Sequence, residues 1–473
     1  MRRSLHVTAY DEVPYTGRPY PDSHPERLAT MATLFGAKPA AIERCRVLEV
    51  ACGDAANLIP MAYELPESEF VGFDLAVQPV EAGRRLAARI GLTNLSLSQR
   101  DLADFPADAG TFDYIIAHGL YSWIPAAARD QLLALISRHL APRGVAFVSY
   151  NVYPGCYVRR MVWEMLRFHT EPLEEPGERV AEAQALARLL AQGQVLNDPY
   201  TALMKAELAR FSSRDAGFLF HDDLAEVNEP CYFHEFVAHA ETHRLQFLCE
   251  AELVATAYVG LAAEVRQVLD ALEPLAREQY LDFAKCRRFR QTLLCHEGVA
   301  IERRIEPERI AGFRFLPRHR GLVGEAAAAE PPRSEEALPR AILDALDAAA
   351  PDALSVDDLA VRIPGSEREY LRALCLAAAQ TGVIQLHMHA PDLATTLAKH
   401  PVASAVARAQ VERGQCVTSL RHVPVDLDDE LVRRMLPLLD GTRDIAALAT
   451  ALGEAPEAID ARLRHLAKLA LLV

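Results

Sequence analysis

The first half of the chain alternates short apolar runs with amphipathic stretches of helical period. Buried strands are predicted near residues 47–50, 70–73, 92–99, 114–117 and 144–155, and carboxylates follow at successive strand ends. Helical patterns separate the strands. The series predicts five βα units, a doubly wound parallel sheet and a ligand across the switch point of that sheet. The expected fold class is therefore α/β.

Two further segments complete this predicted domain. Residues of about 156–215 are helical and amphipathic, with a spacing that fits packing against other helices, so we expect a helical insertion there. A helix over 232–243 and a strand over 245–249 supply the closing pair that an open sheet of this kind still needs. We expect the whole domain to occupy residues 1–255.

The N-terminal segment over 1–35 is rich in tyrosine and proline and becomes helical from about His24. Two arrangements are open for it. It could fold over the ligand as a lid, with an aromatic and acidic side facing the ligand, or it could be a strap packed against the sheet. The residues that would face the ligand in a lid are Tyr10, Asp11, Glu12 and Tyr15.

The remaining residues divide at a linker. The stretch 324–337 is charged, contains proline and is otherwise made of small residues, as is typical of a linker. The linker follows a middle region over residues 256–323, which we expect to have a regulatory role or to form a dimer. Residues 338–473 show two units of three helical patterns each, so we expect a mostly α C-terminal domain of two winged-helix-like modules. Acids outnumber bases there, which favours protein contacts over DNA binding.

Composition narrows the class of protein. The net charge of −15 argues against general nucleic-acid affinity and permits a basic partner, such as a lysine-bearing substrate. Nine scattered cysteines without a Cys-x-x-Cys pair indicate free thiols, and we expect no metal site. The sequence has no long uncharged apolar run and no signal-peptide core, so we expect a cytoplasmic protein without a membrane span.

The turn after the first predicted strand carries the most specific chemistry. Residues 46–62 read RVLEVACGDAANLIPMA: a strand, a tight turn of small residues and a helix that begins near Asn57. Glu49 lies inside the turn, where it would repel a pyrophosphate and would suit a ligand with an ammonium and a sulfonium. The segment resembles the cofactor turn of class I S-adenosylmethionine-dependent methyltransferases, which usually has glycine at the positions of Ala51 and Ala55. A methyl group can be accommodated at negative φ, but it narrows the space for the ligand.

Acids at later strand ends are placed to bind a nucleoside. Asp74 ends the second strand, where a carboxylate can accept both hydroxyls of a ribose. Asp101 follows the third strand and can take an adenine amino group, while the backbone N–H of Leu102 can meet a ring nitrogen. Each acid alone would be an ordinary turn residue. The ordered series predicts a nucleoside site.

The chain resembles the bacterial class I S-adenosylmethionine-dependent methyltransferases that carry a methyltransferase regulatory domain, a group that includes the rickettsial outer-membrane-protein lysine methyltransferases. The motifs that carry the resemblance are YDEVPY, YPDSHPERLA, EVACGDAANLIPMA, GFDLA, AHGLYSWIP, SYNVYPG, RRFRQTLLCH and HPVASAVARAQ. The resemblance implies a Rossmann-like domain that binds S-adenosylmethionine (AdoMet), a regulatory or dimerising middle region, and a C-terminal domain that helps to dock a protein substrate. A homodimer is compatible with this organisation.

The resemblance also implies roles for single residues. Its motif places the methionine end of AdoMet along the turn after the first strand, and it places His118 and Gly119 beside the transferable methyl. Together with the acids above, the residues predicted to bind the cofactor are Tyr15, Glu49, Ala51, Cys52, Gly53, Asn57, Asp74, Leu75, Asp101, Leu102, His118 and Gly119.

Methyl transfer from a sulfonium needs alignment and a pocket more than acid–base groups, because the cofactor carries the reactive centre. A lysine acceptor must first lose a proton, and an aromatic, partly dry pocket lowers its pKa. The loops after the fourth and fifth strands are the natural walls of such a pocket. Their candidate catalytic residues are His118, Tyr121, Trp123, Asn151 and Tyr153, of which His118 and Tyr153 are the best candidates for a base. Trp123 and Tyr153 could equally be core residues.

Two histidine pairs and one arginine cluster lie outside the predicted cofactor site, and we expect structural roles for them. His239 and His243 lie one helical turn apart, which suits a metal pair, but the sequence fixes no third ligand and structural roles are favoured. His387 and His389 share one face of a predicted strand and are expected at the surface. The arginines within 287–290 are expected to pair with nearby acids and with a partner subunit.

Three functions are open at this point. The first is an AdoMet-dependent methyltransferase that acts on protein side chains, with lysine favoured. The second is a small-molecule N- or O-methyltransferase whose C-terminal modules serve assembly or regulation. The third is an AdoMet-binding sensor or scaffold without catalysis, which Ala51 and Ala55 keep open.

Overall fold

The computed structural model describes residues 8–13, 15–196, 198–212, 215–318, 337–391, 393–394 and 396–473. The linker predicted over 324–337 lies outside the described residues except for Ala337, and so do the first seven residues of the predicted lid. Within the described part of the chain, no helix is both long and apolar enough to cross a membrane.

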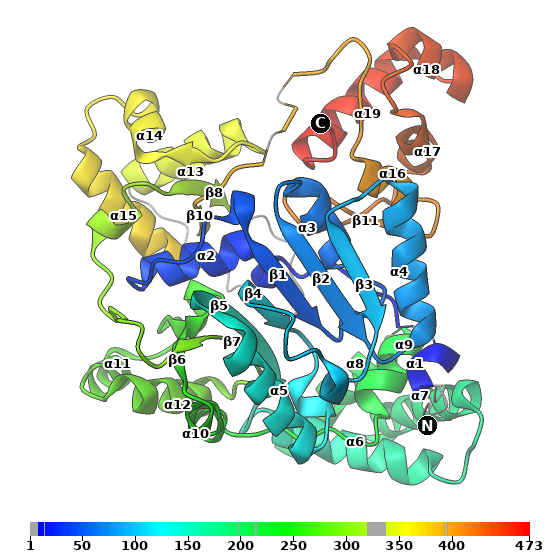
Figure 1. Cartoon of the computed structure of the whole chain (residues 1–473), viewed down its shortest axis with the longest axis vertical. Coiled ribbons are helices and arrows are strands. Elements are labelled where there is room, and N and C mark those ends of the chain that lie inside the picture. The colour runs from blue at the N-terminus through cyan, green and yellow to red at the C-terminus, as the bar shows by residue number, and fades with distance from the viewer. Residues whose placement is uncertain are drawn as a thin grey trace.

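A seven-stranded sheet forms the centre of the molecule, in the order β3-β2-β1-β4-β5-β7-β6 (Figure 1). The five strands from β3 to β5 are parallel, whereas β7 runs antiparallel to both of its neighbours. The doubly wound sheet predicted from the sequence is confirmed, including its closing strand. The strands are β1 (Arg46–Val50), β2 (Glu69–Asp74), β3 (Leu95–Gln99), β4 (Phe112–Ala117), β5 (Leu140–Asn151), β6 (Leu245–Glu250) and β7 (Phe289–His296).

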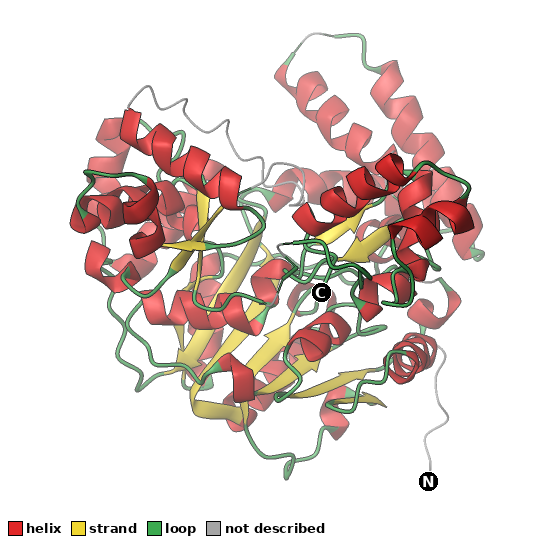
Figure 2. Cartoon of the chain, turned by 90° about the horizontal axis from the view of Figure 1, so that it is seen from above, coloured by secondary structure: helices red, strands yellow, loops and turns green. Residues whose placement is uncertain are grey.

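Helices cover both faces of this sheet (Figure 2). Because successive side chains of a strand point to opposite faces, the strands contribute to two separate hydrophobic cores. On β1, Val47 packs into one core, while Leu48 and Val50 pack into the other. The first core is completed by α2 (Pro25–Leu34), α3 (Leu58–Glu64) and α4 (Val77–Arg89). The second is completed by α5 (Ala126–His139) and α10 (Phe233–Thr242).

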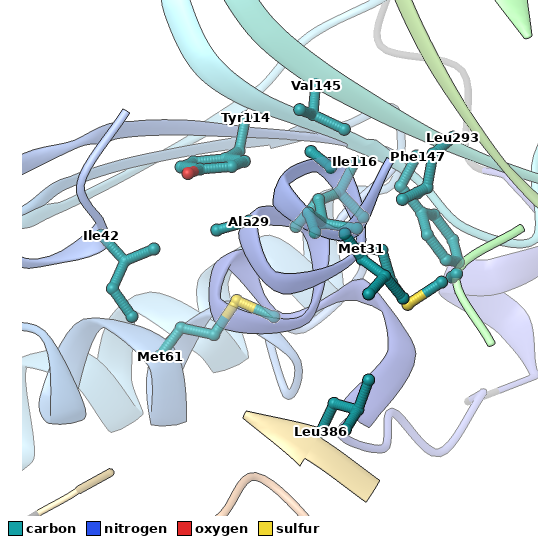
Figure 3. Packing of buried hydrophobic residues seen from close by; sticks show 14 of the residues in the cluster. Ala29, Met31, Ile42, Met61, Tyr114, Ile116, Val145, Phe147, Leu293 and Leu386 are labelled. Atoms are coloured by element: carbon teal, nitrogen blue, oxygen red, sulfur yellow. The ribbon is translucent and has the colours of Figure 1, made fainter. Parts of the chain in front are cut away.

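The helix α2 lies between the sheet and the C-terminal part of the chain. Nine of its ten residues are buried. Figure 3 shows its apolar side chains between residues of the sheet on one side and Leu386 on the other. Glu26 accepts a hydrogen bond from the backbone N–H of Met388 at 2.8 Å, so the polar side of α2 is also bonded. The predicted lid over 1–35 is therefore too long, because α2 is a strap packed against the sheet.

The two histidines predicted at the surface are instead contacts between domains. His387 Nδ1 lies 3.2 Å from Glu26 Oε2, and His389 Nδ1 lies 3.5 Å from Glu43 Oε1. Their side chains are only 18% and 22% exposed. The prediction was wrong because the catalytic domain covers both the end of β10 at His387 and the segment after it that carries His389.

The insertion after β5 is helical, as the sequence predicted, and has a core of its own. Its bounds are close to the predicted 156–215. It consists of α6 (Cys156–Thr170), α7 (Pro176–Gly193), α8 (Pro199–Ser212), α9 (Ala216–Phe218) and a π-helical turn over Leu219–Asp223. The short helix α1 (Ala9–Glu12) precedes the sheet in the chain and contacts α4.

The sheet extends beyond the predicted domain boundary at residue 255. Strand β7 belongs to the predicted middle region over 256–323, yet it pairs with β5 through Ala146–Leu294 and with β6 through Leu245–His296. The helices α11 (Ala263–Asp270) and α12 (Pro274–Lys285) lead directly into it. The middle region is thus part of the catalytic fold up to residue 296, because a strand between two others cannot belong to a separate domain.

Two small units follow, and the first also begins earlier than the predicted residue 338. Its three-stranded sheet includes β8, which precedes the linker. Its elements are β8 (Arg314–Pro317), α13 (Ala337–Ala349), β9 (Leu354–Ser355), α14 (Val356–Arg362), α15 (Arg368–Gln380) and β10 (Ile384–His387). The second unit has its own core and consists of α16 (Ala405–Gln410), β11 (Cys416–Thr418), β12 (Pro424–Asp426), α17 (Glu430–Met435), α18 (Ile445–Leu452) and α19 (Pro456–Lys468).

The predicted pairing of the 287–290 arginines with acids is clearest at Arg290, whose side chain is 0% exposed. Its guanidinium donates to Glu250 at 2.6 Å, to Glu278 at 3.1 Å and to Asp282 at 2.9 Å.

Arg290→Ala would leave these buried carboxylates without their shared cation. We expect the free energy of unfolding to fall by about 3–5 kcal/mol in denaturant titrations. Arg304→Ala is the control, since that arginine is exposed, and a loss as small as the control's would contradict the role of Arg290.

Candidate functional site

A cavity of about 2070 Å³ opens at the carboxyl ends of the parallel strands. Loops after β1, β2, β4 and β5 line it, together with the N-terminal arm (residues 8–13 and 15–20), the insertion and the second C-terminal unit. Because β1 and β4 are adjacent at the switch point, the loops that follow them diverge there and leave room for a ligand. The predicted site residues that line the cavity are Tyr15, Glu49, Ala51, Cys52, Gly53, Asn57, Asp74, Leu75, His118, Gly119, Trp123 and Asn151.

The turn between β1 and α3 is left-handed at three positions. Ala51 has φ +58°, Gly53 has φ +53° and Ala55 has φ +57°. The alanines do not use the negative φ at which a methyl group is easily accommodated; they adopt the conformation that glycine would adopt. A left-handed alanine costs roughly 1–2 kcal/mol because its Cβ crowds the backbone. The chain holds this strained turn at the edge of the cavity.

Glu49, the last residue but one of β1, has a carboxylate of which one oxygen is hydrogen-bonded within the described part of the chain and the other is not. Its Oε1 accepts a hydrogen bond from Asn57 Nδ2 at 2.7 Å, whereas its Oε2 is buried and has no hydrogen-bond partner among the described residues. The pKa of Glu49 is raised to about 8, mainly by burial; the nearby carboxylates of Asp54 and Asp74 contribute to the rise, and the Asn57 bond opposes it. An entering cation would offset both the burial and the repulsion.

Asn57, which precedes α3, uses all the hydrogen-bonding capacity of its amide. Its Nδ2 donates to Glu49 and, at 3.0 Å, to Ser23 Oγ. Its Oδ1 accepts from the backbone N–H of Tyr20 at 2.8 Å and lies 2.8 Å from His422 Nε2. An amide offers two donors and two acceptor sites, so this side chain is saturated.

Asp74 braces the turn from β2. Its Oδ2 accepts from the backbone N–H of Gly53 at 2.9 Å, and its Oδ1 accepts from that of Ala76 at 2.8 Å. Burial raises the pKa of Asp74 above its ordinary value, against these two hydrogen bonds. Leu75, the next residue, is exposed and lines the cavity.

Asp101 and Leu102 do not line the cavity. The Asp101 carboxylate accepts a hydrogen bond from the backbone N–H of Ala103 at 2.9 Å and caps a short 3₁₀ helix. Leu102 packs against the second core. After β3 the chain turns into this helix, which contacts α5, so the structure does not bring the predicted adenine residues to the site.

Two of the predicted pocket walls also lie elsewhere. The Tyr121 hydroxyl lies 2.9 Å from His239 Nδ1, and its ring packs edge-on against Phe236. Tyr153 stacks on Tyr157 with ring centroids 4.1 Å apart, outside the cavity lining. Tyr153 is half-buried and its hydroxyl accepts a hydrogen bond from Arg160 Nη1 at 3.2 Å, so it fits neither the pocket-wall prediction nor the core alternative.

His118 and Trp123 do line the cavity, and so does Asn151. The His118 ring packs against the Tyr20 ring at an interplanar angle of 33°, with centroids 3.7 Å apart, and its Nδ1 lies 3.2 Å from Ser149 Oγ. Burial lowers the pKa of His118 to about 4, so the imidazole is neutral near pH 7. A neutral ring of this kind can orient a partner by a hydrogen bond but is a weak base for an amine.

The N-terminal arm contributes Tyr20, which the sequence analysis did not assign, together with Tyr10 and Tyr15, which it placed on the ligand side of a lid. Tyr10 stacks on His221 of the insertion, with centroids 3.9 Å apart, and Tyr15 lies edge-on to Phe218. Tyr20 supplies the ring that packs against His118. The lid alternative therefore fits the arm, although not α2. The motif YPDSHPERLA, which begins at Tyr20, was the signal that could have identified it.

The His239 and His243 pair acquires a third polar group in Asp130 of α5. Asp130 Oδ1 lies 3.4 Å from His239 Nε2 and 2.8 Å from His243 Nε2, and the three ligand atoms lie within 4.8 Å of one another. Tyr121 engages the remaining nitrogen of His239. These contacts join α5 to α10, which agrees with the structural role favoured from the sequence.

Three family models match the chain. A methyltransferase domain matches residues 47–144, and a predicted methyltransferase regulatory domain matches residues 215–296. A model described as the C-terminal winged helix domain of PKMT matches residues 399–465, within the second C-terminal unit. The recognition made from the sequence, a methyltransferase domain followed by a methyltransferase regulatory domain, is confirmed.

The chain is also similar to individual proteins. It is 35% identical over 310 residues to the uncharacterized protein RP789 of Rickettsia prowazekii, a match that covers 65% of this chain and 56% of that protein. The chain therefore spans little more than half the length of this relative. The uncharacterized protein RP028 of the same organism is 29% identical over 249 residues, which are 52% of this chain and 100% of that protein.

The fold as a whole is shared with a solved structure. PKMT2 from Rickettsia typhi in complex with AdoHcy superposes with a TM-score of 0.86 at 24% sequence identity, over 97% of this chain and 100% of that chain. At this level of identity the likeness shows a common fold, which includes the C-terminal units.

The left-handed alanines give a matched pair of variants. Ala51→Gly removes the strain of φ +58° at a partly exposed position, so we expect the free energy of unfolding to rise by about 0.5–1 kcal/mol in denaturant titrations without ligand. Ala55→Gly also relieves strain, but it removes a methyl group that is 0% exposed, worth about 0.8 kcal/mol, so we expect almost no change. An Ala51→Gly variant less stable than the parent would contradict this account of the turn.

Proposed function

We propose that this chain, which carries a class I methyltransferase domain, transfers the methyl group of AdoMet to a protein side chain, with lysine as the favoured acceptor. The observation that carries the proposal is the buried Oε2 of Glu49, which faces the cavity without a hydrogen-bond partner among the described residues. A buried carboxylate with an unused oxygen fits an ammonium group. The structure of PKMT2 from Rickettsia typhi in complex with AdoHcy supports the same choice of cofactor.

The residues of the cavity fit the other parts of AdoMet. Glu49 would hold the ammonium of its methionine moiety, and Asp74, braced by two backbone N–H groups, would hold the ribose hydroxyls. Leu75, which follows Asp74, would offer an apolar contact beside the nucleoside. Asp101 and Leu102 are left out of this assignment because they do not line the cavity. When bound, AdoMet supplies an electrophilic methyl on a sulfonium, and the chain supplies alignment.

The rest of the cavity suits an amine that must be neutral to react. Small-molecule sites typically enclose roughly 300–1,000 Å³, so a cavity of about 2070 Å³ leaves room for a second, larger partner. His118, Tyr20 and Trp123 supply aromatic surface there, which can hold an amine or a methylated cation. Burial raises the pKa of Tyr20 to about 12, so its hydroxyl stays protonated. We therefore assign deprotonation of lysine to the drying of the pocket rather than to a strong base.

The acceptor is tested by transferring labelled methyl from AdoMet to a lysate and separating protein from small molecules. We expect label in protein, on lysine, and we expect Asp74→Asn to reduce the transfer at limiting AdoMet because the ribose loses a charged acceptor. Label confined to the small-molecule fraction would favour a small-molecule methyltransferase. Binding of AdoMet without any transfer would favour the sensor or scaffold. A cytoplasmic location and a homodimer stay predictions from the sequence.

Protonation of Glu49 gives a test of cofactor binding that is independent of the acceptor. With a pKa of about 8, raised by burial, Glu49 is mostly protonated at pH 7 in the free protein. An ammonium favours the carboxylate, so binding of AdoHcy at pH 7 should release close to one proton, and affinity should rise by up to about tenfold per pH unit between pH 6 and 8.

Calorimetry in buffers of different ionisation enthalpy measures this proton release. Glu49→Gln is the matched control, because the amide keeps the shape of the side chain but cannot titrate. We expect weaker binding by that variant and no proton release. The same proton release in the variant and the parent chain would show that Glu49 does not meet the ammonium.

A further inference from the structure

The second C-terminal unit reaches into the cofactor turn through one side chain. His422 lies in the turn between β11 and β12, 365 positions after Asn57, and is only 2% exposed. Its Nε2 lies 2.8 Å from Asn57 Oδ1. This contact joins two parts of the fold that are far apart in the chain.

The direction of this hydrogen bond is fixed by its partner. A carbonyl oxygen such as Asn57 Oδ1 only accepts, so His422 Nε2 must carry the hydrogen. Burial, together with nearby His24, lowers the pKa of His422 well below its ordinary value, which keeps the ring neutral. Its Nδ1 is buried without a hydrogen-bond partner among the described residues, so the ring makes this one bond.

The backbone of His422 is held in a conformation that histidine rarely adopts. Its φ is +56°, in the left-handed region. The turn is braced from within, because the backbone N–H of Ser419 donates to the Val423 carbonyl at 2.9 Å and the N–H of Val423 donates to Ser419 Oγ at 3.2 Å. A strained residue kept in place by its surroundings is typical of a functional position.

The same unit also contacts the far end of α3. The backbone N–H of Ala405, at the start of α16, lies 3.4 Å from the hydroxyl of Tyr63 in the last turn of α3. Arg89, at the end of α4, pairs with Glu412 of the unit. Docking of the unit therefore fixes α3 at both ends, and Asn57 stands at the end beside Glu49.

We infer that His422 is a positioning residue through which the second C-terminal unit sets the affinity of the cofactor turn: His422 holds the Asn57 amide, and Asn57 holds the Glu49 carboxylate. The inference rests on the proposed function, since Glu49 is the group that meets the ammonium. Without the His422 donor, Asn57 Oδ1 keeps only the Tyr20 N–H, and its Nδ2 is less firmly aimed at Glu49.

Coupling of this kind is reciprocal. If docking of the unit tightens cofactor binding, then the cofactor must tighten docking of the unit by the same factor. The effect should therefore be visible from both sides of the contact: in the affinity for AdoHcy, and in the hydrogen exchange of the turn over 419–423.

Three substitutions at one position separate positioning from folding. His422→Gln places an amide N–H close to the place of Nε2 and should retain affinity for AdoHcy within about threefold. His422→Asn carries its amide nearer the place of Nδ1, although asparagine tolerates the left-handed backbone better than glutamine does. We expect it to bind roughly tenfold more weakly, as should His422→Ala. His400→Ala, an exposed histidine of the same unit, is the control.

Binding is measured by calorimetry with AdoHcy on the full chain. Where methyl transfer is measurable, the weakened variants should raise the KM for AdoMet and leave kcat nearly unchanged. Equal affinities of His422→Asn, His422→Gln and the parent chain would overturn the inference, and so would a loss in His422→Gln as large as that in His422→Asn.

A second measurement needs no variant. Addition of AdoHcy to the parent chain should slow amide hydrogen exchange in the 419–423 turn, and unchanged exchange there despite binding would overturn the inference while leaving the proposed function intact. Failure of the parent chain to bind AdoHcy at all would overturn both.

Discussion

The cofactor turn depends on the four hydrogen bonds of the Asn57 amide. They join the N-terminal arm, strand β1 and the second C-terminal unit, which are far apart in the sequence. Since every donor and acceptor of the amide is used, no other residue of similar size could make the same set of contacts. The geometry of the site is therefore a property of the whole chain rather than of the sheet alone.

Two buried charged groups in this molecule have opposite environments. Arg290 is surrounded by carboxylates that neutralise its charge and accept its hydrogen bonds. It therefore stabilises the fold and is not available to bind a ligand. Glu49 is equally buried but has one neutral donor and an unused oxygen, so its environment favours protonation until a cation arrives. The left-handed φ of Ala51 further destabilises the turn that follows Glu49. This difference in environment distinguishes Arg290, whose charge stabilises the fold, from Glu49, whose carboxylate remains available to bind a cation.

The parallel strands could be predicted because both faces of the sheet are covered, which requires continuous apolar runs. Strand β7 could not, because it lies in a segment that contains three arginines, and the acids that neutralise Arg290 become its neighbours only in the folded chain. The positions of Glu49 and Asp74 at strand ends correctly predicted that they line the cavity. The same argument was wrong for Asp101, because the sequence of a strand end does not show which way the following turn bends. His422 had no signal at all, because its partner is 365 positions away.

The central position of α2 has a consequence for the order in which the protein can be completed during synthesis. The helix ends at Leu34, yet the strand that covers its outer side contains Leu386 and emerges about 350 residues later. At roughly 5–20 residues per second, translation leaves this apolar side uncovered for about 20–70 s. The nascent catalytic domain is thus unfinished until β10 leaves the ribosome, and one of the first helices to be made is among the last to reach its final surroundings.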